Sequence, residues 1–112
     1  MEIRKWRVYL ANLDPRMGTE PGEVRPVVVV QTDLLNGIHP STVVCPLTTK
    51  TRRQARFLRV HLAAGEGGVK APSDIMMDQL RAIDNRRLFH RLGVISRRNQ
   101  ARLATSLRIL LT

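Results

Sequence analysis

Histidine and cysteine are the side chains of this sequence best suited to nucleophilic attack, proton transfer or metal binding. His39, His61 and His90 are far apart along the chain, and none has a second histidine at the spacing of a zinc motif. Two of them could still meet in space as an acid–base pair, but scattered histidines are more often structural or exposed. Cys45, the only cysteine, lies in an apolar, β-branched run. We therefore expect a buried structural thiol, with no disulfide and no metal site.

Arginine dominates the remaining chemistry. The chain carries 19 basic and 9 acidic residues, a net charge of +10, and sixteen of the basic residues are arginine. The planar guanidinium fork suits phosphate oxygens, so we expect a polyanionic partner and favour nucleic acid over an acidic protein or an anionic membrane. One basic cluster comprises Lys50, Arg52, Arg53, Arg56 and Arg59. A second comprises Arg81, Arg86, Arg87 and Arg91.

Short strands and loops must position these side chains. The 112 residues suit a single domain, residues 1–112, and the hydrophobic pattern predicts strands at 7–13, 24–31, 42–47, 57–62 and 75–83. Residues 14–23 form a loop rich in glycine and proline, 33–35 a short helical turn and 48–56 a polar, basic connection, whereas 88–95 is ambiguous. Ser96 is an expected N-cap, and a leucine and alanine stripe follows it. These elements predict a mainly β fold with α (α+β), a small, partly open barrel with a C-terminal helix packed against it.

Several classes of protein do not fit this sequence. No apolar run approaches a membrane span and no secretory signal is visible, so we expect a soluble, cytoplasmic protein. The glycines of residues 65–68 are not followed by the Lys-Ser or Lys-Thr of a phosphate-binding loop. Four aromatic residues are too few for a base-stacking platform.

Three motifs resemble the MazF/PemK-type toxins, the mRNA interferases. The first is Leu13-Asp14-Pro15, then Gly18-Thr19-Glu20, then Arg25-Pro26 and an aliphatic run. The second is Val44-Cys45-Pro46-Leu47-Thr48-Thr49, and the third is Asp78-Gln79-Leu80-Arg81-Ala82-Ile83-Asp84, followed by Arg87-Leu88. They occur in the order and at the spacing of the family and together cover most of residues 7–95.

The resemblance implies an SH3-like or plasmid-maintenance-toxin barrel that forms a homodimer. It also implies sequence-selective cleavage of single-stranded RNA by 2′-hydroxyl attack, with no metal and no cofactor, and an antitoxin partner, which we expect to be acidic. The chain departs from the family in having Trp6-Arg7 in place of Gly-Asp and Pro21 in place of glutamine. Met76 replaces a catalytic arginine of the PemK branch, so the mechanism of that branch does not transfer whole.

The resemblance also assigns roles to residues. Arg25 matches the catalytic arginine and would stabilise the phosphorane, and Thr48 would donate a hydrogen bond to a phosphoryl oxygen. Glu20 would accept the 2′-hydroxyl proton, with Asp78 as the rival base. The residues expected to bind RNA are Lys50, Arg52, Arg53, Arg56, Gln79 and Arg81.

Two other functions stay open at this stage. One is a DNA gyrase poison of the CcdB type, which shares the fold but depends on a tryptophan near the C-terminus, where this chain has Arg108-Ile109-Leu110-Leu111-Thr112. The other is a non-catalytic RNA-binding barrel, in which Arg25 would be an ordinary rim charge and Thr48 would only cap the end of a strand.

Overall fold

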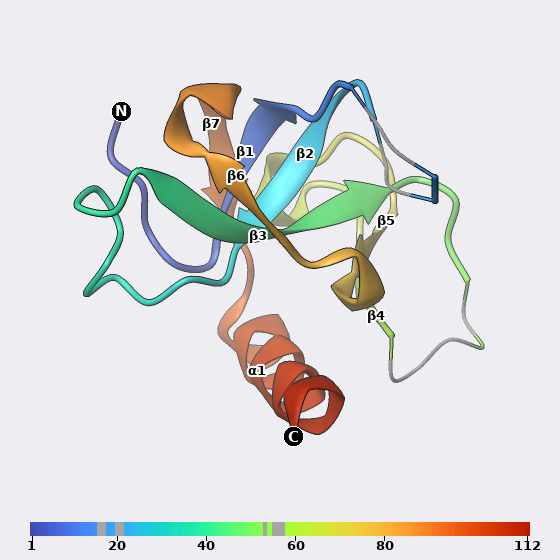
Figure 1. Cartoon of the computed structure of the whole chain (residues 1–112). Coiled ribbons are helices and arrows are strands. Elements are labelled where there is room, and N and C mark those ends of the chain that lie inside the picture. Colours follow the sequence, from blue (N-terminus) through green and yellow to red (C-terminus); the bar gives the residue numbers. More distant parts are fainter. Residues whose placement is uncertain (16–17, 20–21, 53, 55–57) are drawn as a thin grey trace.

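A computed structural model describes residues 1–15, 18–19, 22–52, 54 and 58–112. Within these residues the chain forms seven strands and one α-helix (Figure 1). The strands are β1 (Arg7–Asn12), β2 (Val24–Val29), β3 (Ser41–Thr48), β4 (Arg59–Leu62), β5 (Ser73–Met76), β6 (Arg81–Asp84) and β7 (Leu88–Val94). The 3-10 turns are η1 (Glu66–Gly68), η2 (Met77–Gln79) and η3 (Asn85–Arg87), and the chain ends in α1 (Arg97–Leu111).

The strands form one antiparallel sheet in the order β4-β5-β3-β2-β1-β7, with β6 paired to β3 outside this path. β3 is the centre of the arrangement because different strands pair with its two halves. β2 lies along one side of it. On the other side, β6 pairs with residues 41–44 and β5 pairs with Leu47 and Thr48. The turn η2 connects β5 to β6 and so lies next to the middle of β3.

The central strands β2 and β3 are largely buried on both faces because they are apolar on both sides. Val28 and Cys45 belong to one core cluster, whereas Val27 and Val44 belong to another. The helix α1 packs on the first cluster through Leu103, which is fully buried. The run of valines in β2 therefore contributes to both cores, as its lack of alternation predicts.

The helix begins where its N-cap predicts. The Ser96 hydroxyl accepts a hydrogen bond from the backbone N–H of Asn99 at 3.2 Å. The side chain of Asn99 in turn donates to Glu66 at 2.7 Å, which ties the first turn of α1 to η1. The predicted apolar stripe is only partly covered, since Leu110 and Leu111 are exposed.

The mainly β fold with a C-terminal helix is confirmed, and the predicted elements differ from the observed ones only locally. Residues 75–83, predicted as one strand, form the end of β5, the turn η2 and β6. They divide because β5 and β6 pair with different halves of β3. The short helical turn predicted at 33–35 is present, because the N–H groups of Leu35 and Asn36 both donate to the Thr32 carbonyl. The ambiguous residues 88–95 mostly form β7. The strand predicted at 57–62 is β4, which begins at Arg59, and Phe57 lies outside the described residues.

Candidate active site

Arg25 and Thr48 lie side by side on neighbouring strands. β2 and β3 pair with Val27 opposite Pro46, and beyond that pair β2 extends to Arg25 and β3 extends to Thr48. The guanidinium of Arg25 reaches β3, where its Nη1 donates to the Leu47 carbonyl at 3.2 Å. The sequence motifs therefore meet in space at the ends of β2 and β3.

The Arg25 guanidinium is held at two points. Nε donates to the Gly22 carbonyl at 3.2 Å, and Nη1 donates to Leu47 on the adjacent strand. A guanidinium has five N–H bonds, so three remain after these two contacts. Within the described part of the chain the guanidinium of Arg25 forms no other hydrogen bond. The side chain is half-buried, which fixes its position while leaving donors for an anion.

Thr48 is half-buried, and among the described residues its hydroxyl contacts one partner. The backbone N–H of Lys50 donates to Oγ1 of Thr48 at 3.2 Å. Because Oγ1 acts as the acceptor in this contact, its own proton is free to be donated elsewhere. The short turn after β3 therefore prepares Thr48 as a hydrogen-bond donor beside Arg25.

Of the two candidate bases, Glu20 and Asp78, the structure describes only Asp78. Glu20 lies outside the described residues. Asp78 is exposed in η2, and no hydrogen bond or ion pair joins it to Arg25 or Thr48 in the described ranges. It lies near Cys45, whose thiol pKa is raised to about 12, first by burial and second by the charge of Asp78. Cys45 is thus a buried, protonated thiol, as its apolar surroundings predict.

The loop that carries Glu20 is fastened at its base, within the described residues. The Leu13 N–H donates to the Glu23 carbonyl at 2.9 Å, and the Glu23 N–H donates to the Asp14 carboxylate at 2.6 Å. Arg87 reaches across from η3 and donates to the carbonyls of Asn12 and Asp14. The second basic cluster thus contributes a loop anchor, a role that its sequence did not predict.

The residues predicted to bind RNA, and the remaining arginines of the two basic clusters, differ in how far their side chains are exposed. Lys50 and Arg52 are exposed beyond β3, and Gln79 is half-buried in η2. Arg81 pairs with Val44, on the face of β3 that also carries Thr48. Val44 and Thr48 are four residues apart on β3, which is about 13 Å along the strand.

Arg53 and Arg56 lie outside the described residues. Arg86 is bound to Asp84 at 3.0 Å and lowers the pKa of that carboxyl to about 2.

Arg81 carries an atom with unusual surroundings. Its Nη1 is buried and has no hydrogen-bond partner among the described residues. A buried donor without a partner costs free energy, so this N–H is available to an acceptor that reaches it.

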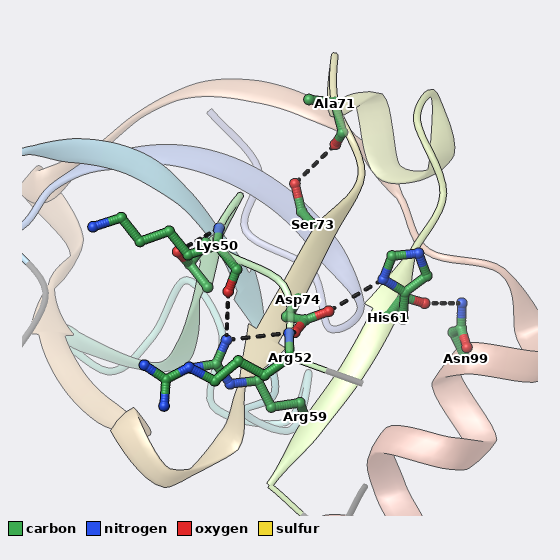
Figure 2. A network of polar contacts seen from close by, with 9 residues as sticks. Lys50, Arg52, Arg59, His61, Ala71, Ser73, Asp74 and Asn99 are labelled. Carbon is green, nitrogen blue, oxygen red and sulfur yellow. Dashed lines mark hydrogen bonds and ion pairs between the residues drawn. The ribbon is translucent and has the colours of Figure 1, made fainter. Parts of the chain in front are cut away.

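A buried carboxylate beside Thr48 is the feature that sequence reasoning missed. Asp74 on β5 pairs directly with Thr48 and is 2% exposed. It accepts from the Arg52 N–H at 2.7 Å, from Arg59 Nη1 at 3.4 Å and from His61 Nδ1 at 3.1 Å (Figure 2). Arg59, grouped by sequence with the phosphate-binding cluster, is therefore directed inward, and its side chain is 16% exposed.

Residues 4–111 match the family described as PemK-like, MazF-like toxins of type II toxin–antitoxin systems. A curated relative, the endoribonuclease EndoA of Bacillus subtilis strain 168, is 35% identical over 88 residues, which are 79% of this chain and 76% of the relative. The chain belongs to the PemK-like, MazF-like toxin family. The sequence-based identification is thereby confirmed.

Solved structures of the family share the fold of this toxin. The MazF structure from Deinococcus radiodurans has a TM-score of 0.81 at 26% identity and covers 99% of this chain and 97% of its own. A MazE–MazF structure from the same organism has a TM-score of 0.77 at 26% identity, with 99% and 96% covered. The helix of this toxin that the structure describes is too short and too polar to cross a membrane.

Proposed function

We propose that this toxin cleaves single-stranded RNA by attack of the 2′-hydroxyl on the adjacent phosphate, at a site formed by Arg25 and Thr48. The protein is an endoribonuclease toxin of a toxin–antitoxin system, which its family and its relative EndoA support. The observation that carries the mechanism is that the guanidinium of Arg25 is anchored to the Leu47 carbonyl, next to Thr48. The hydroxyl of that threonine accepts from the Lys50 N–H and so keeps its own proton for donation.

The reaction needs three groups. A base accepts the 2′-hydroxyl proton as the 2′-oxygen bonds to phosphorus. The bond from phosphorus to the 5′-oxygen breaks as that oxygen takes a proton from an acid, which is either the Arg25 guanidinium or water. Positive charge stabilises the phosphorane that forms between these two events. The products are a 2′,3′-cyclic phosphate and a 5′-hydroxyl. Arg25, with three N–H bonds not engaged by Gly22 or Leu47, stabilises the negative charge that builds on the phosphorane oxygens. The Thr48 hydroxyl donates a hydrogen bond to one of the same oxygens.

Either Glu20 or Asp78 accepts the 2′-hydroxyl proton. A general base must come within hydrogen-bond distance of the hydroxyl, directly or through one water. Asp78 is exposed and so is open to RNA. Replacing each carboxylate by its amide, as Glu20→Gln and Asp78→Asn, distinguishes them, because only the base should lose most of the cleavage rate without losing RNA affinity.

RNA binds along the basic surface beside this centre, through contacts that do not depend on base identity. The residues that we propose for this surface are Lys50, Arg52, Arg53, Arg56, Gln79 and Arg81. The active form is a homodimer in the cytoplasm, where it meets mRNA and cleaves it at a selected sequence. Its partner is an acidic antitoxin, an assembly supported by the MazE–MazF structures from Deinococcus radiodurans.

Incubation of the purified protein with one long RNA, followed by mapping of the cut ends, tests this function. We expect a small number of sites that share a short sequence, each ending in a 2′,3′-cyclic phosphate. RNA that stays intact, or binds without being cut, would favour the non-catalytic barrel.

A further inference from the structure

A continuous path of hydrogen bonds connects Thr48 to the buried carboxylate of Asp74. The Thr48 Oγ1 accepts from the Lys50 N–H at 3.2 Å, and the carbonyl of the same Lys50 accepts from Arg59 Nη1 at 2.9 Å. That guanidinium also contacts Asp74 Oδ2 at 3.4 Å (Figure 2). Lys50, which donates to the threonine hydroxyl, is therefore held in place through its carbonyl by the ion pair of Arg59 with Asp74.

Asp74 fixes the chain beyond β3 at a second point. Its Oδ2 accepts the Arg52 N–H at 2.7 Å, so the carboxylate holds the connection at Arg52 directly and at Lys50 through Arg59. His61 occupies the other oxygen, Oδ1, through its Nδ1 at 3.1 Å. With Oδ1 bound to β4, Oδ2 remains directed at the segment that follows Thr48.

Stability alone does not account for this carboxylate. Taking a charge out of water is costly even when it is paired, and replacing buried ion pairs by apolar residues of similar size is often neutral or stabilising. The Asp74 side chain is 3% exposed, and both flanking residues of β5, Ser73 and Ile75, are buried too. A buried charge that contacts both the segment after Thr48 and the neighbouring strand is better explained by the geometry that it imposes.

We propose that Asp74, acting with Arg59, is a positioning residue for Thr48 that fixes the direction in which the threonine hydroxyl donates its proton. This inference rests on the proposed function of Thr48. Asp74 does not touch RNA in this proposal; it holds the Lys50 peptide, and the Lys50 N–H occupies the threonine oxygen as an acceptor. If Asp74 and Arg59 did not hold the Lys50 peptide, the Thr48 side chain would change rotamer, and its hydroxyl would donate to nearby backbone carbonyls instead.

The test uses Asp74→Asn in the intact protein, with Asp84→Asn as the matched control. Asparagine keeps the shape of the side chain but removes the negative charge that binds the Arg59 guanidinium, and its NH₂ group faces either His61 Nδ1 or the two donors from Arg52 and Arg59. Asp84 is a surface carboxylate paired with Arg86, far less buried than Asp74, and the same substitution there removes the same charge. We expect single-turnover cleavage at saturating RNA to fall about ten- to hundredfold in Asp74→Asn, since small misplacements of reacting groups have effects of this size. The control should stay within twofold of the natural protein.

A double-mutant cycle separates positioning from general damage. If Asp74 acts through Thr48, then Asp74→Asn should change the rate less than twofold when Thr48→Ala is already present. An RNA with a sulfur leaving group at the mapped cleavage position keeps the slowest variants measurable. The affinity for an RNA with a 2′-deoxy nucleotide at that position should change less than the rate. Independent, multiplying effects of the two substitutions would overturn the proposal.

Arg59→Met covers the case in which Asp74→Asn does not fold. Methionine keeps the apolar stem but removes the donor to the Lys50 carbonyl, so the rate should fall about three- to tenfold and again not in the Thr48→Ala background. Full activity of Arg59→Met and Asp74→Asn beside an impaired Thr48→Ala would refute the positioning role alone. Full activity of Thr48→Ala would instead refute the proposed function.

Discussion

Removal of the Arg25 guanidinium gives the most direct test of the candidate active site. In Arg25→Ala two hydrogen bonds disappear, those from Nε to Gly22 and from Nη1 to Leu47. The side chain is half-buried, so water can reach these carbonyls once the guanidinium is gone. A hydrogen bond from a charged group contributes about 1.5–3 kcal/mol net to stability, but solvation of the freed acceptors at this half-buried site offsets most of the loss. We therefore expect a decrease of about 1 kcal/mol, or roughly 4–8 °C in Tm for a domain near this size.

The effect on cleavage should be far larger than the effect on stability. A preorganised donor that acts on transition-state charge contributes on the order of 10²–10³ in rate. Arg25→Lys keeps the charge, but a single ammonium cannot span Gly22, Leu47 and a phosphate at once, so we expect intermediate activity. The assay pairs a thermal melt with single-turnover cleavage of one RNA.

Arg91→Ala is the matched control for this prediction. Arg91 lies exposed on β7, so its loss changes the net charge by the same amount. A cleavage rate of Arg25→Ala within threefold of the Arg91→Ala rate would refute the role of Arg25 in catalysis. An Arg25→Ala protein that is unfolded at 25 °C would show that the guanidinium is mainly a structural link between β2 and β3.

Three further predictions concern the whole protein. Cleavage should continue in excess EDTA, because Arg25 and Thr48 supply the charge and the hydrogen bond that the phosphorane needs; a strict Mg²⁺ requirement, or 3′-hydroxyl ends on the products, would contradict this. Light scattering at micromolar concentration should give a dimer, because Leu110 and Leu111 extend an apolar stripe that α1 leaves exposed; a fully active monomer is the contrary result. An acidic antitoxin should compete with RNA for the basic surface, with a Kd that rises with salt; cleavage by a complex that still holds the antitoxin would show that the two bind separate surfaces.

The local pattern of the sequence determined most of the elements. The valine run from Val27 to Val30 predicted a strand buried on both faces, and β2 contributes to both core clusters. Ser96 predicted the start of α1 because an N-cap depends only on the few residues that follow it. The motifs around Arg25 and Thr48 led to the toxin family, since their order and spacing are properties of the chain alone.

Tertiary structure decided which side chains meet. Residues 75–83 have the composition of one strand, but β3 is longer than either β5 or β6, and its two halves take different partners. Asp74 gave no local signal because a polar residue near the start of a strand is ordinary; its importance comes from the register that sets it opposite both Thr48 and His61. Arg59 was indistinguishable by sequence from its exposed neighbours, because the direction of a long side chain depends on the buried carboxylate that binds it. Sequence specifies periodicity and charge along one chain, whereas cross-strand neighbours depend on register, and register is set only when all the strands of the sheet are paired.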